Sequence, residues 1–272
     1  MLFKHNNINK FEVVDIDKFI QYEETDDQKV EQIVNDMSNK EILKSPVIYD
    51  KKLSLLIDGH HRLKAIKRLG AKNIAVFNVN YFSDDVTIQN WYRIIYNMKT
   101  QDISELSYMI TKKQQRSVLS EADTKKSIII SSNEKNLFEH SFLNEEEINN
   151  FLNIFCKEVT IKKKGLIRLS SNKKLSCKGS TERAILTIKP PVDKSAVLKM
   201  ARSDRLFQYQ INRHLIKDRP LQINLPIEIL HLDIRKATKL YQNIILNKQF
   251  VSSKNIWHDN RFYEEKVMLF YE

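Results

Sequence analysis

The sequence predicts an α/β (α+β) protein, with strands and helices alternating in an N-terminal domain and a second, mixed α/β domain after it. Short runs of β-branched and aromatic residues alternate with amphipathic helical segments through the first hundred residues. This pattern is typical of strands connected by helices. Only four glycines and five prolines occur in 272 residues, so each of them is informative about where an element ends.

The first expected elements are a strand at residues 11–16 and a helix that ends near residue 39. Asp26 or Asp27 supplies the N-cap of this helix, because an aspartate side chain can accept hydrogen bonds from the first backbone N–H groups. The apolar positions of the helix recur every three or four residues and are Val30, Ile33, Val34 and Met37.

The next segments continue the alternation of strand and helix. Residues 46–49 and 53–57 are short apolar runs that predict two strands. A helix is expected over residues 60–69, with Gly70 as its C-terminal stop. Residues 74–79 then predict another strand.

Beyond this strand, Asp84 or Asp85 is expected to open a helix that ends near residue 97. The polar stretch 111–126 is interpreted as a linker or an exposed helix. Asn144 is the expected cap of a helix that ends near residue 159, with three glutamates at its positive end. The remaining expected elements are strands at 184–188, 221–225 and 266–271, and helices at 193–202 and 227–247.

The charge distribution suggests a domain boundary near residue 100, giving domains 1–100 and 101–272. Residues 1–100 carry 15 Lys+Arg against 14 Asp+Glu, whereas residues 101–272 carry 30 against 20. The excess is densest at 157–178, where eight basic residues stand beside one acid. Such a segment is either a solvated lysine-rich face or a surface that attracts phosphates or nucleic acid. It contains no aromatic residue on which bases could stack.

Several classes of protein are excluded by composition. No apolar run approaches the ~20 residues needed to cross a bilayer, and the N-terminus lacks the apolar core of a signal peptide. We therefore expect a cytoplasmic protein without a membrane partner. Cys156 and Cys177 make neither a disulfide framework nor a CxxC zinc pattern, and the seven histidines show no metal-binding spacing.

The segment most informative about chemistry is Asp58-Gly59-His60-His61-Arg62, which follows an apolar strand and opens a helix. The first N–H groups of a helix lack intrahelical partners, and the helix dipole adds positive potential there, so the place favours phosphate. Arg62 could chelate phosphate oxygens, and Asp58 could hold a Mg²⁺ ion that bridges phosphates. From spacing alone, the same residues also fit a helix cap, a turn and a surface arginine.

This segment, continued to Leu69-Gly70, resembles the GxxRxxA box of the ParB/sulfiredoxin-like superfamily. Its Asp-Gly-His-His-Arg form is similar to that of the free L-serine kinases, which include archaeal ADP-dependent enzymes and an ATP-dependent ParB-like kinase of siderophore pathways. The resemblance covers about residues 11–92. Fainter similarity to the same family is carried by Arg205-Leu206-Phe207, Asn212-Arg213-His214, Arg219-Pro220-Leu221 and Arg261-Phe262-Tyr263.

The resemblance implies a kinase that transfers a phosphoryl group from ATP or ADP, with Mg²⁺, to the hydroxyl of free L-serine, giving O-phospho-L-serine. It implies that residues 1–100 form a ParB/sulfiredoxin-like nucleotide-binding catalytic domain. Residues 101–272 would form an α/β domain that completes the substrate site. Glu23 is implied as the base that accepts the serine hydroxyl proton, with Glu24 as the alternative.

The resemblance also implies roles for the other candidate residues. Asp58 would be catalytic and would bind metal or orient phosphate. Trp91 would form a wall of the serine pocket, and Arg213 and His214 would reach from the second domain to the substrate carboxylate or the transferred phosphate. The implied phosphate cradle consists of Gly59, His60, His61 and Arg62.

Two other interpretations stay open. ParB relatives bind DNA, and the basic C-terminal half would suit a phosphate backbone, so the alternative function is a DNA-binding transcriptional regulator or partition-type protein. Residues 102–130, where a helix-turn-helix would be expected, are polar and end in a strand-like run. A sulfiredoxin-like repair enzyme would need a reactive cysteine in the motif, where this chain has His60 and His61.

Overall fold

The chain forms two compact units, each built from separate stretches of sequence. Unit 1 comprises Met1–Thr87, Val197–Tyr209 and His214–Glu272, and unit 2 comprises Ile88–Ala196 and Gln210–Arg213. The division into compact units therefore does not fall at the boundary near residue 100 that the sequence suggested, because the C-terminal segment completes the first unit. The computed structural model describes residues 5–114, 126–132, 135–142, 144–162, 166–170, 183–189, 191–203, 205–208, 211–259 and 261–271.

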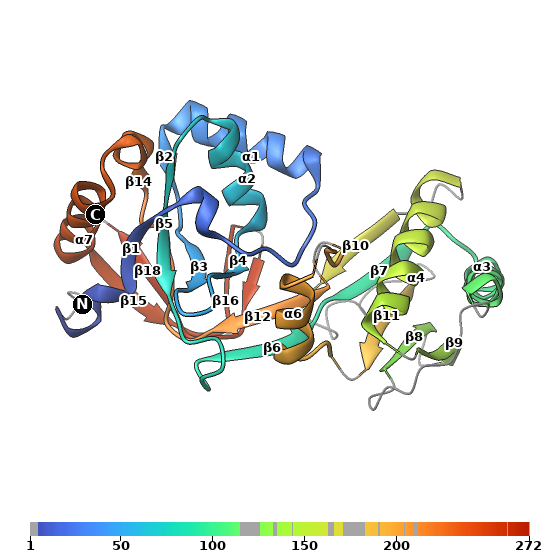
Figure 1. Cartoon of the computed structure of the whole chain (residues 1–272). Helices are drawn as coiled ribbons and strands as arrows, with labels where there is room; N and C mark the ends of the chain where they lie inside the picture. The colour runs from blue at the N-terminus through green and yellow to red at the C-terminus, as the bar shows by residue number, and fades with distance from the viewer. Residues whose placement is uncertain are drawn as a thin grey trace. The chain divides into compact units, whose positions relative to one another are not determined.

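The main sheet of unit 1 has four strands in the order β1-β5-β3-β4 (Figure 1). β1 runs antiparallel to β5, β5 parallel to β3, and β3 antiparallel to β4. β3, β4 and β5 are buried along almost their whole length, as expected for strands covered on both faces. The strands are β1 (Phe11–Asp15), β3 (Val47–Asp50), β4 (Leu55–Asp58) and β5 (Asn73–Asn78).

Three helices accompany this sheet: α1 (Asp27–Lys40), α2 (His60–Arg68) and α7 (Ile234–Asn247). α1 packs on α2, and α2 packs on β3. α7 lies beside the edge strand β1 (Figure 1). There, the Thr238 hydroxyl accepts from the backbone N–H of Val13, and the Gln242 amide donates to the Phe11 carbonyl. These side chains pair part of the outer edge of β1, which would otherwise be open to another strand.

Smaller sheets complete unit 1. β13, β18 and β15 form a three-stranded sheet, β2 pairs with β14, and β16 pairs with β17 in a hairpin. The strands are β2 (Ile42–Leu43), β13 (Arg219–Leu221), β14 (Leu225–Pro226), β15 (Gln249–Ser253), β16 (Ile256–His258), β17 (Arg261–Tyr263) and β18 (Val267–Tyr271). The short 3₁₀ helices are η1 (His5–Lys10), η2 (Ile16–Lys18) and η4 (Ile227–His231).

Unit 2 is built on a five-stranded sheet in the order β10-β7-β11-β8-β9. Its core is aromatic, with the rings of Phe138, Phe151 and Phe155 stacked in series. The strands are β7 (Tyr92–Tyr96), β8 (Lys126–Ser132), β9 (Lys135–Phe142), β10 (Leu166–Ser170) and β11 (Ala184–Lys189). Among its described residues, the helices are α3 (Thr100–Gln114) and α4 (Glu145–Lys157), and a π-helical turn, η3 (Glu158–Lys162), follows α4.

The chain passes from unit 1 to unit 2 within β6 (Val86–Asn90) and returns to unit 1 within β12 (Asn212–Ile216), and these two strands pair. α6 (Lys194–Ala201) spans another such passage. The predicted helix from residue 84 to residue 97 is wrong, because this segment forms β6 and β7. Its β-branched and aromatic residues, dense at Tyr92–Tyr96, favour strands.

Most of the other predicted elements are confirmed to within a few residues, including the N-caps Asp26 and Asn144. The single strand predicted at 221–225 is wrong. Gln222 and Asn224 have φ of 58° and 53°, which ends β13 and separates it from β14. The predicted helix 227–247 is divided into η4 and α7, because Asp233 caps a new helix start.

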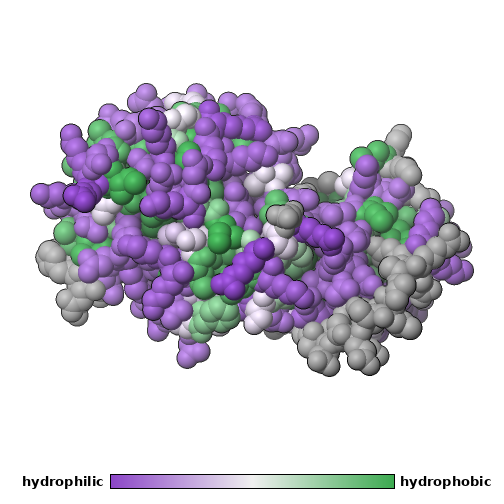
Figure 2. Space-filling model, in the orientation of Figure 1, coloured by the Kyte–Doolittle hydropathy of each residue, from purple (hydrophilic) through white to green (hydrophobic). Residues whose placement is uncertain are grey.

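The face of the molecule in Figure 2 is mostly hydrophilic, and its apolar residues lie in separate patches. Within the described ranges, no helix is long and apolar enough to cross a membrane. Most of the basic segment 157–178 lies outside those ranges.

Candidate active site

The turn between β4 and α2 requires glycine. Gly59 has φ of 112°, a conformation that side chains rarely allow. A Cβ atom at Gly59 would lie 2.6 Å from Cγ1 of Val47 on the neighbouring strand. β4 ends at Asp58 and α2 begins at His60, so this turn brings the Asp58 carboxylate beside the first backbone N–H groups of the helix.

The start of α2 is a suitable place for an anion. Gly59 supplies no side-chain cap, and the first turn of the helix contains no acidic residue. Backbone N–H groups at a helix start lack intrahelical partners, and the helix dipole makes this end positive. A phosphate group is the ligand that such an arrangement favours most in nucleotide-binding proteins.

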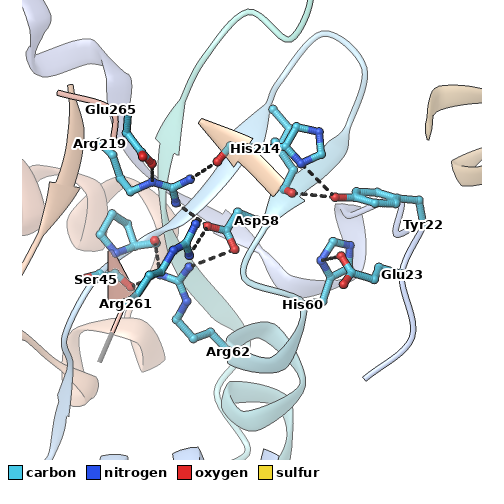
Figure 3. Close-up of polar contacts among 12 residues, drawn as sticks. Tyr22, Glu23, Ser45, Asp58, His60, Arg62, His214, Arg219, Arg261 and Glu265 are labelled. Carbon is cyan, nitrogen blue, oxygen red and sulfur yellow. Dashed lines mark hydrogen bonds and ion pairs between the residues drawn. The ribbon is translucent and has the colours of Figure 1, made fainter. Parts of the chain in front are cut away.

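Three arginines surround the Asp58 carboxylate (Figure 3). Arg219 donates to Oδ2 in a direct hydrogen bond. Nη1 of Arg261 lies 3.6 Å from Oδ2, and Nη2 of Arg62 lies 3.8 Å from Oδ1. Burial would raise the pKa of Asp58, but Arg219, Arg261 and Arg62 together hold this pKa well below its usual value. Asp58 is therefore a carboxylate throughout the physiological range.

Arg219 has a structural role in this site, because all the nitrogens of its side chain are hydrogen-bonded. Its side chain is only 3% exposed, and each of its three nitrogens has an acceptor. Nε donates to Glu265 Oε1 over 3.1 Å, Nη1 donates to Asp58, and Nη2 donates to the backbone carbonyl of His214 over 2.9 Å. Arg219 thus ties together three parts of unit 1 that are far apart in sequence.

Arg62 faces the loop before β3. Its Nη1 donates to the Ser45 carbonyl over 2.9 Å and also to the Pro46 carbonyl. These bonds anchor the loop to α2. One of the two terminal nitrogens of Arg62 is thus already bonded to the loop. The predicted role of Arg62 in binding phosphate stays a prediction.

Glu23, the predicted base, lies close to the start of α2. The segment around it pairs with Phe207: Glu24 N–H donates to the Phe207 carbonyl, and Phe207 N–H donates to the Tyr22 carbonyl, each over 2.8 Å. The Glu23 carboxylate is almost buried, and its Oε2 lies 3.9 Å from Nδ1 of His60 (Figure 3). The structure therefore brings the predicted base beside the predicted phosphate site, while Glu24 is the more exposed of the two acids.

The two histidines of the motif serve different contacts. His60 is 4% exposed, and burial lowers its pKa to about 3. Its Nε2 is buried without a hydrogen-bond partner among the described residues. Nε2 of His61 accepts from the Asp26 N–H over 3.1 Å, and burial lowers the pKa of His61 to about 4. Both rings are therefore neutral at pH 7.

His214 lies in unit 1, between two buried tyrosines. Its Nδ1 is 3.3 Å from the Tyr22 hydroxyl, and its Nε2 is 3.1 Å from the Tyr81 hydroxyl. Tyr22 donates its proton to the Ile57 carbonyl over 3.0 Å, so it accepts from Nδ1 of His214. Tyr81 then donates to Nε2. Burial, followed by the charge of Glu23, raises the pKa of Tyr22 well above its usual value.

Two predicted substrate-binding residues lie together in unit 2. The guanidinium of Arg213 is 5.7 Å from the ring centre of Trp91, in cation–π geometry. Arg213 is almost completely buried, and Trp91 is partly exposed. Their predicted contacts with serine stay a prediction.

Sequence reasoning missed four residues of this site: Tyr22, Arg219, Arg261 and Glu265. The two arginines stand in segments that carried the fainter family resemblance, which was the available signal, although it gave them no role. Tyr22 and Glu265 have no distinctive sequence context. Their importance follows only from the contacts they make with residues far away in the chain.

The arrangement does not fit Asp58 as a direct Mg²⁺ ligand. Mg²⁺ sites in such enzymes use one or two carboxylates together with substrate phosphates, but three guanidinium groups already face Asp58. Their charge opposes a divalent cation at the same oxygens. Among the residues described, no three His, Cys, Asp or Glu side chains form a group that could hold a metal.

No family profile matches the chain, but individual proteins do. It is 23% identical over 232 residues to the ATP-dependent L-serine kinase of Staphylothermus marinus, covering 80% of this chain and 90% of that protein. It is 30% identical over 83 residues to the ADP-dependent L-serine kinase SerK of Thermococcus kodakarensis, covering 29% of this chain and 34% of that protein.

Solved structures show the same fold. A free serine kinase in complex with AMP superposes with a TM-score of 0.62 at 18% identity, covering 81% of this chain and 93% of the other. SbnI with a C-terminal truncation, from Staphylococcus aureus, superposes with a TM-score of 0.67 at 12% identity, covering 89% and 98%. The predicted α/β fold and the predicted resemblance to free L-serine kinases are confirmed. The alternative of a DNA-binding regulator is not favoured.

Proposed function

We propose that this chain is a kinase that transfers a phosphoryl group from ATP or ADP to the hydroxyl of free L-serine, giving O-phospho-L-serine. The observation that carries this proposal is the position of Glu23. Its carboxylate lies 3.9 Å from the first residue of α2, whose N-terminus suits phosphate. The similarity to L-serine kinases over most of the chain supports the same conclusion.

The chemistry needs a base, an aligned phosphate and charge compensation. Glu23 accepts the serine hydroxyl proton while the serine oxygen forms a bond to the terminal phosphorus of the nucleotide. The bond from that phosphorus to its bridging oxygen breaks, so the released product is ADP when ATP is the donor and AMP when ADP is the donor. The start of α2 and the arginines around Asp58 offset the negative charge of the phosphates.

The proposed cofactors are ATP or ADP, with Mg²⁺ supplying charge neutralisation on the nucleotide phosphates. The catalytic role of Asp58, the cradle of Gly59, His60, His61 and Arg62, and the contacts of Trp91, Arg213 and His214 with serine are parts of this proposal. The hydrogen bonds of His214 to Tyr22 and Tyr81 favour a structural role, in which His214 helps to hold Tyr22, the residue directly before Glu23. We place the reaction in the cytoplasm, where free serine and nucleotides occur.

The test is ³¹P NMR of the purified protein with Mg²⁺, L-serine and either ATP or ADP. We expect a phosphomonoester signal identified as O-phosphoserine, and the comparison of the two nucleotides identifies the donor. Glu23→Ala should lower the rate by about 10²–10⁴-fold, the usual contribution of general base catalysis. Glu24→Ala is the matched control, because it removes the neighbouring carboxylate and should leave most of the activity.

Two outcomes would contradict the proposal. If both nucleotides stay intact in the presence of serine, the chain is not a serine kinase. If Glu24→Ala abolishes turnover and Glu23→Ala does not, the kinase stands but the base is assigned to the wrong residue.

A further inference from the structure

The outer edge of β1 is only partly covered by α7. The Thr238 hydroxyl accepts from the Val13 N–H over 3.0 Å, on the side of β1 away from β5. In an antiparallel strand the N–H and C=O of one residue point to the same side, and that side alternates along the strand. The Val13 carbonyl and the Asp15 N–H therefore also face outward. Within the described ranges, neither of these two groups has a hydrogen-bond partner.

The spacing of these two groups matches the main chain of a single amino acid. A carbonyl at one residue and an N–H two residues later, on the same edge, are the groups that a parallel neighbouring strand uses. They bond to the N–H and the C=O of one facing residue. A free α-amino acid carries a donor, its ammonium group, and an acceptor, its carboxylate, on either side of one carbon atom. The open part of the β1 edge therefore suits the two polar groups of a free amino acid.

This open edge lies in a surface hollow of about 640 Å³, which β1, the turn between β3 and β4, and the first half of α7 enclose. The volume is in the range of small-molecule sites. Lys51 in this hollow is paired with Glu12, with 2.9 Å between Nζ and Oε2. Among the residues that the structure describes, no carboxylate pairs with Lys18, Arg235 or Lys239, which also line the hollow.

The charges of the hollow match the two ends of a zwitterion. Four cations line it against two carboxylates, Glu12 and Asp15, so the net charge is +2 and favours a ligand with a carboxylate. Arg235 and Lys239 are four residues apart on α7 and so lie on one face of the helix. The Asp15 carboxylate at the end of β1 offers the opposite charge for an ammonium group.

We propose that this hollow binds a free α-amino acid, whose ammonium donates to the Val13 carbonyl and whose carboxylate accepts from the Asp15 N–H and from the cations of α7. β1 and β4 form opposite edges of the main sheet, and the proposed active site is at Asp58, at the end of β4. The amino-acid site is therefore separate from the proposed serine site. It goes beyond the proposed function and does not depend on it.

The test is a titration of the ¹⁵N-labelled full chain with each of the standard L-amino acids, without nucleotide, followed at the assigned Asp15 amide signal by NMR. At least one amino acid should give a saturable shift of this signal. Its carboxyl amide and its deaminated analogue each lack one of the two charged groups, so each should bind about 10-fold more weakly or worse.

Variants of α7 supply the matched comparison. The double substitution Arg235→Ala with Lys239→Ala should weaken the binding of that amino acid by roughly 10- to 100-fold, the usual effect of losing charge-assisted hydrogen bonds. Lys236→Ala is the control, because Lys236 is an exposed cation of the same helix that does not line the hollow. It should change the affinity by less than about 3-fold. All three positions are exposed, and thermal unfolding checks that each variant stays folded.

Three outcomes would overturn the inference. The first is the absence of a saturable shift at Asp15 with every amino acid. The second is equal binding of the deaminated analogue, which would make the hollow a general anion site. The third is binding of the dipeptide L-alanyl-L-alanine without binding of any free amino acid, which would indicate a peptide terminus as the ligand. L-Serine at the proposed active site is distinguished, because its shifts would not respond to the α7 variants. Since the titration needs no turnover, its failure and that of the proposed function are seen separately.

Discussion

The hydroxyl of Tyr22 donates to the backbone carbonyl of Ile57 over 3.0 Å. Tyr22 directly precedes Glu23, and Ile57 directly precedes Asp58. One hydrogen bond therefore fixes the spacing between the segment with the proposed base and the strand that leads to the phosphate site. The ring of Tyr22 also packs edge-on against His60, with 4.8 Å between ring centres, so the same residue supports both sides of the site.

Tyr22→Phe should lower both activity and stability. The variant leaves the Ile57 carbonyl and His214 with one partner fewer in a buried place, which costs about 1–3 kcal/mol of unfolding free energy. We expect kcat to fall by about 10-fold, because Glu23 is held less firmly. Urea unfolding and steady-state kinetics check this. Tyr108→Phe, at a side chain that is 53% exposed, should change neither quantity. If Tyr22→Phe and Tyr108→Phe have the same activity and stability, the hydrogen bond from Tyr22 to Ile57 has no role in either.

Gly59→Ala should be strongly destabilising. The added Cβ lies 2.6 Å from Val47 and the backbone has φ of 112°, so strain and overlap act together and should cost about 3 kcal/mol or more. Gly70→Ala is the matched control, since Gly70 also has positive φ, 75°, but nothing lies within 4 Å of its added Cβ. It should cost about 1 kcal/mol. The two melting temperatures, compared under the same conditions, test whether crowding at Gly59 matters beyond its φ.

Acidification should destabilise the fold through His60. The unfolded side chain binds a proton near pH 6.5, whereas burial lowers the pKa in the folded chain to about 3. The stability is therefore fully present above pH 6.5 and is lost as the pH falls from 6.5 toward 3. At pH 5 the loss from this group is about 2 kcal/mol. Unfolding free energies between pH 7 and pH 5 should show a smaller decline in His60→Asn than in the wild type. An identical decline would mean that His60 is not buried as a neutral ring.

Asp58→Asn should leave the arginine cluster with too much positive charge. The pKa of Asp58 is held well below its usual value, so the carboxylate is charged in the wild type at neutral pH. We expect the free energy of unfolding to fall by about 1–3 kcal/mol. This is less than for a fully buried ion pair, because the Asp58 side chain is 26% exposed. Asp17→Asn, at a side chain that is 84% exposed and paired only at the surface, should cost less than about 0.5 kcal/mol. Denaturant titrations of both variants give the comparison.

The sequence determined the local features of this protein. Strand and helix periods, the caps Asp26 and Asn144, and the turn at Gly59 depend on residues within a few positions of one another, so they can be predicted from neighbours alone. The motif that begins at Asp58 could be recognised for the same reason. At β6 and β7 the β-branched and aromatic residues favour strands, although aspartates before them suggested a helix start, and both segments form strands that pair with others.

Only the tertiary structure decided how the site is completed. Glu23 is placed by its pairing with Phe207, and Asp58 by arginines 161 and 203 residues later in the chain. The return of residues 214–272 to the first unit brings these groups together. Contacts between such distant residues leave no periodic pattern in a single sequence, because they depend on which surfaces pack, and the order of residues along the chain does not record this.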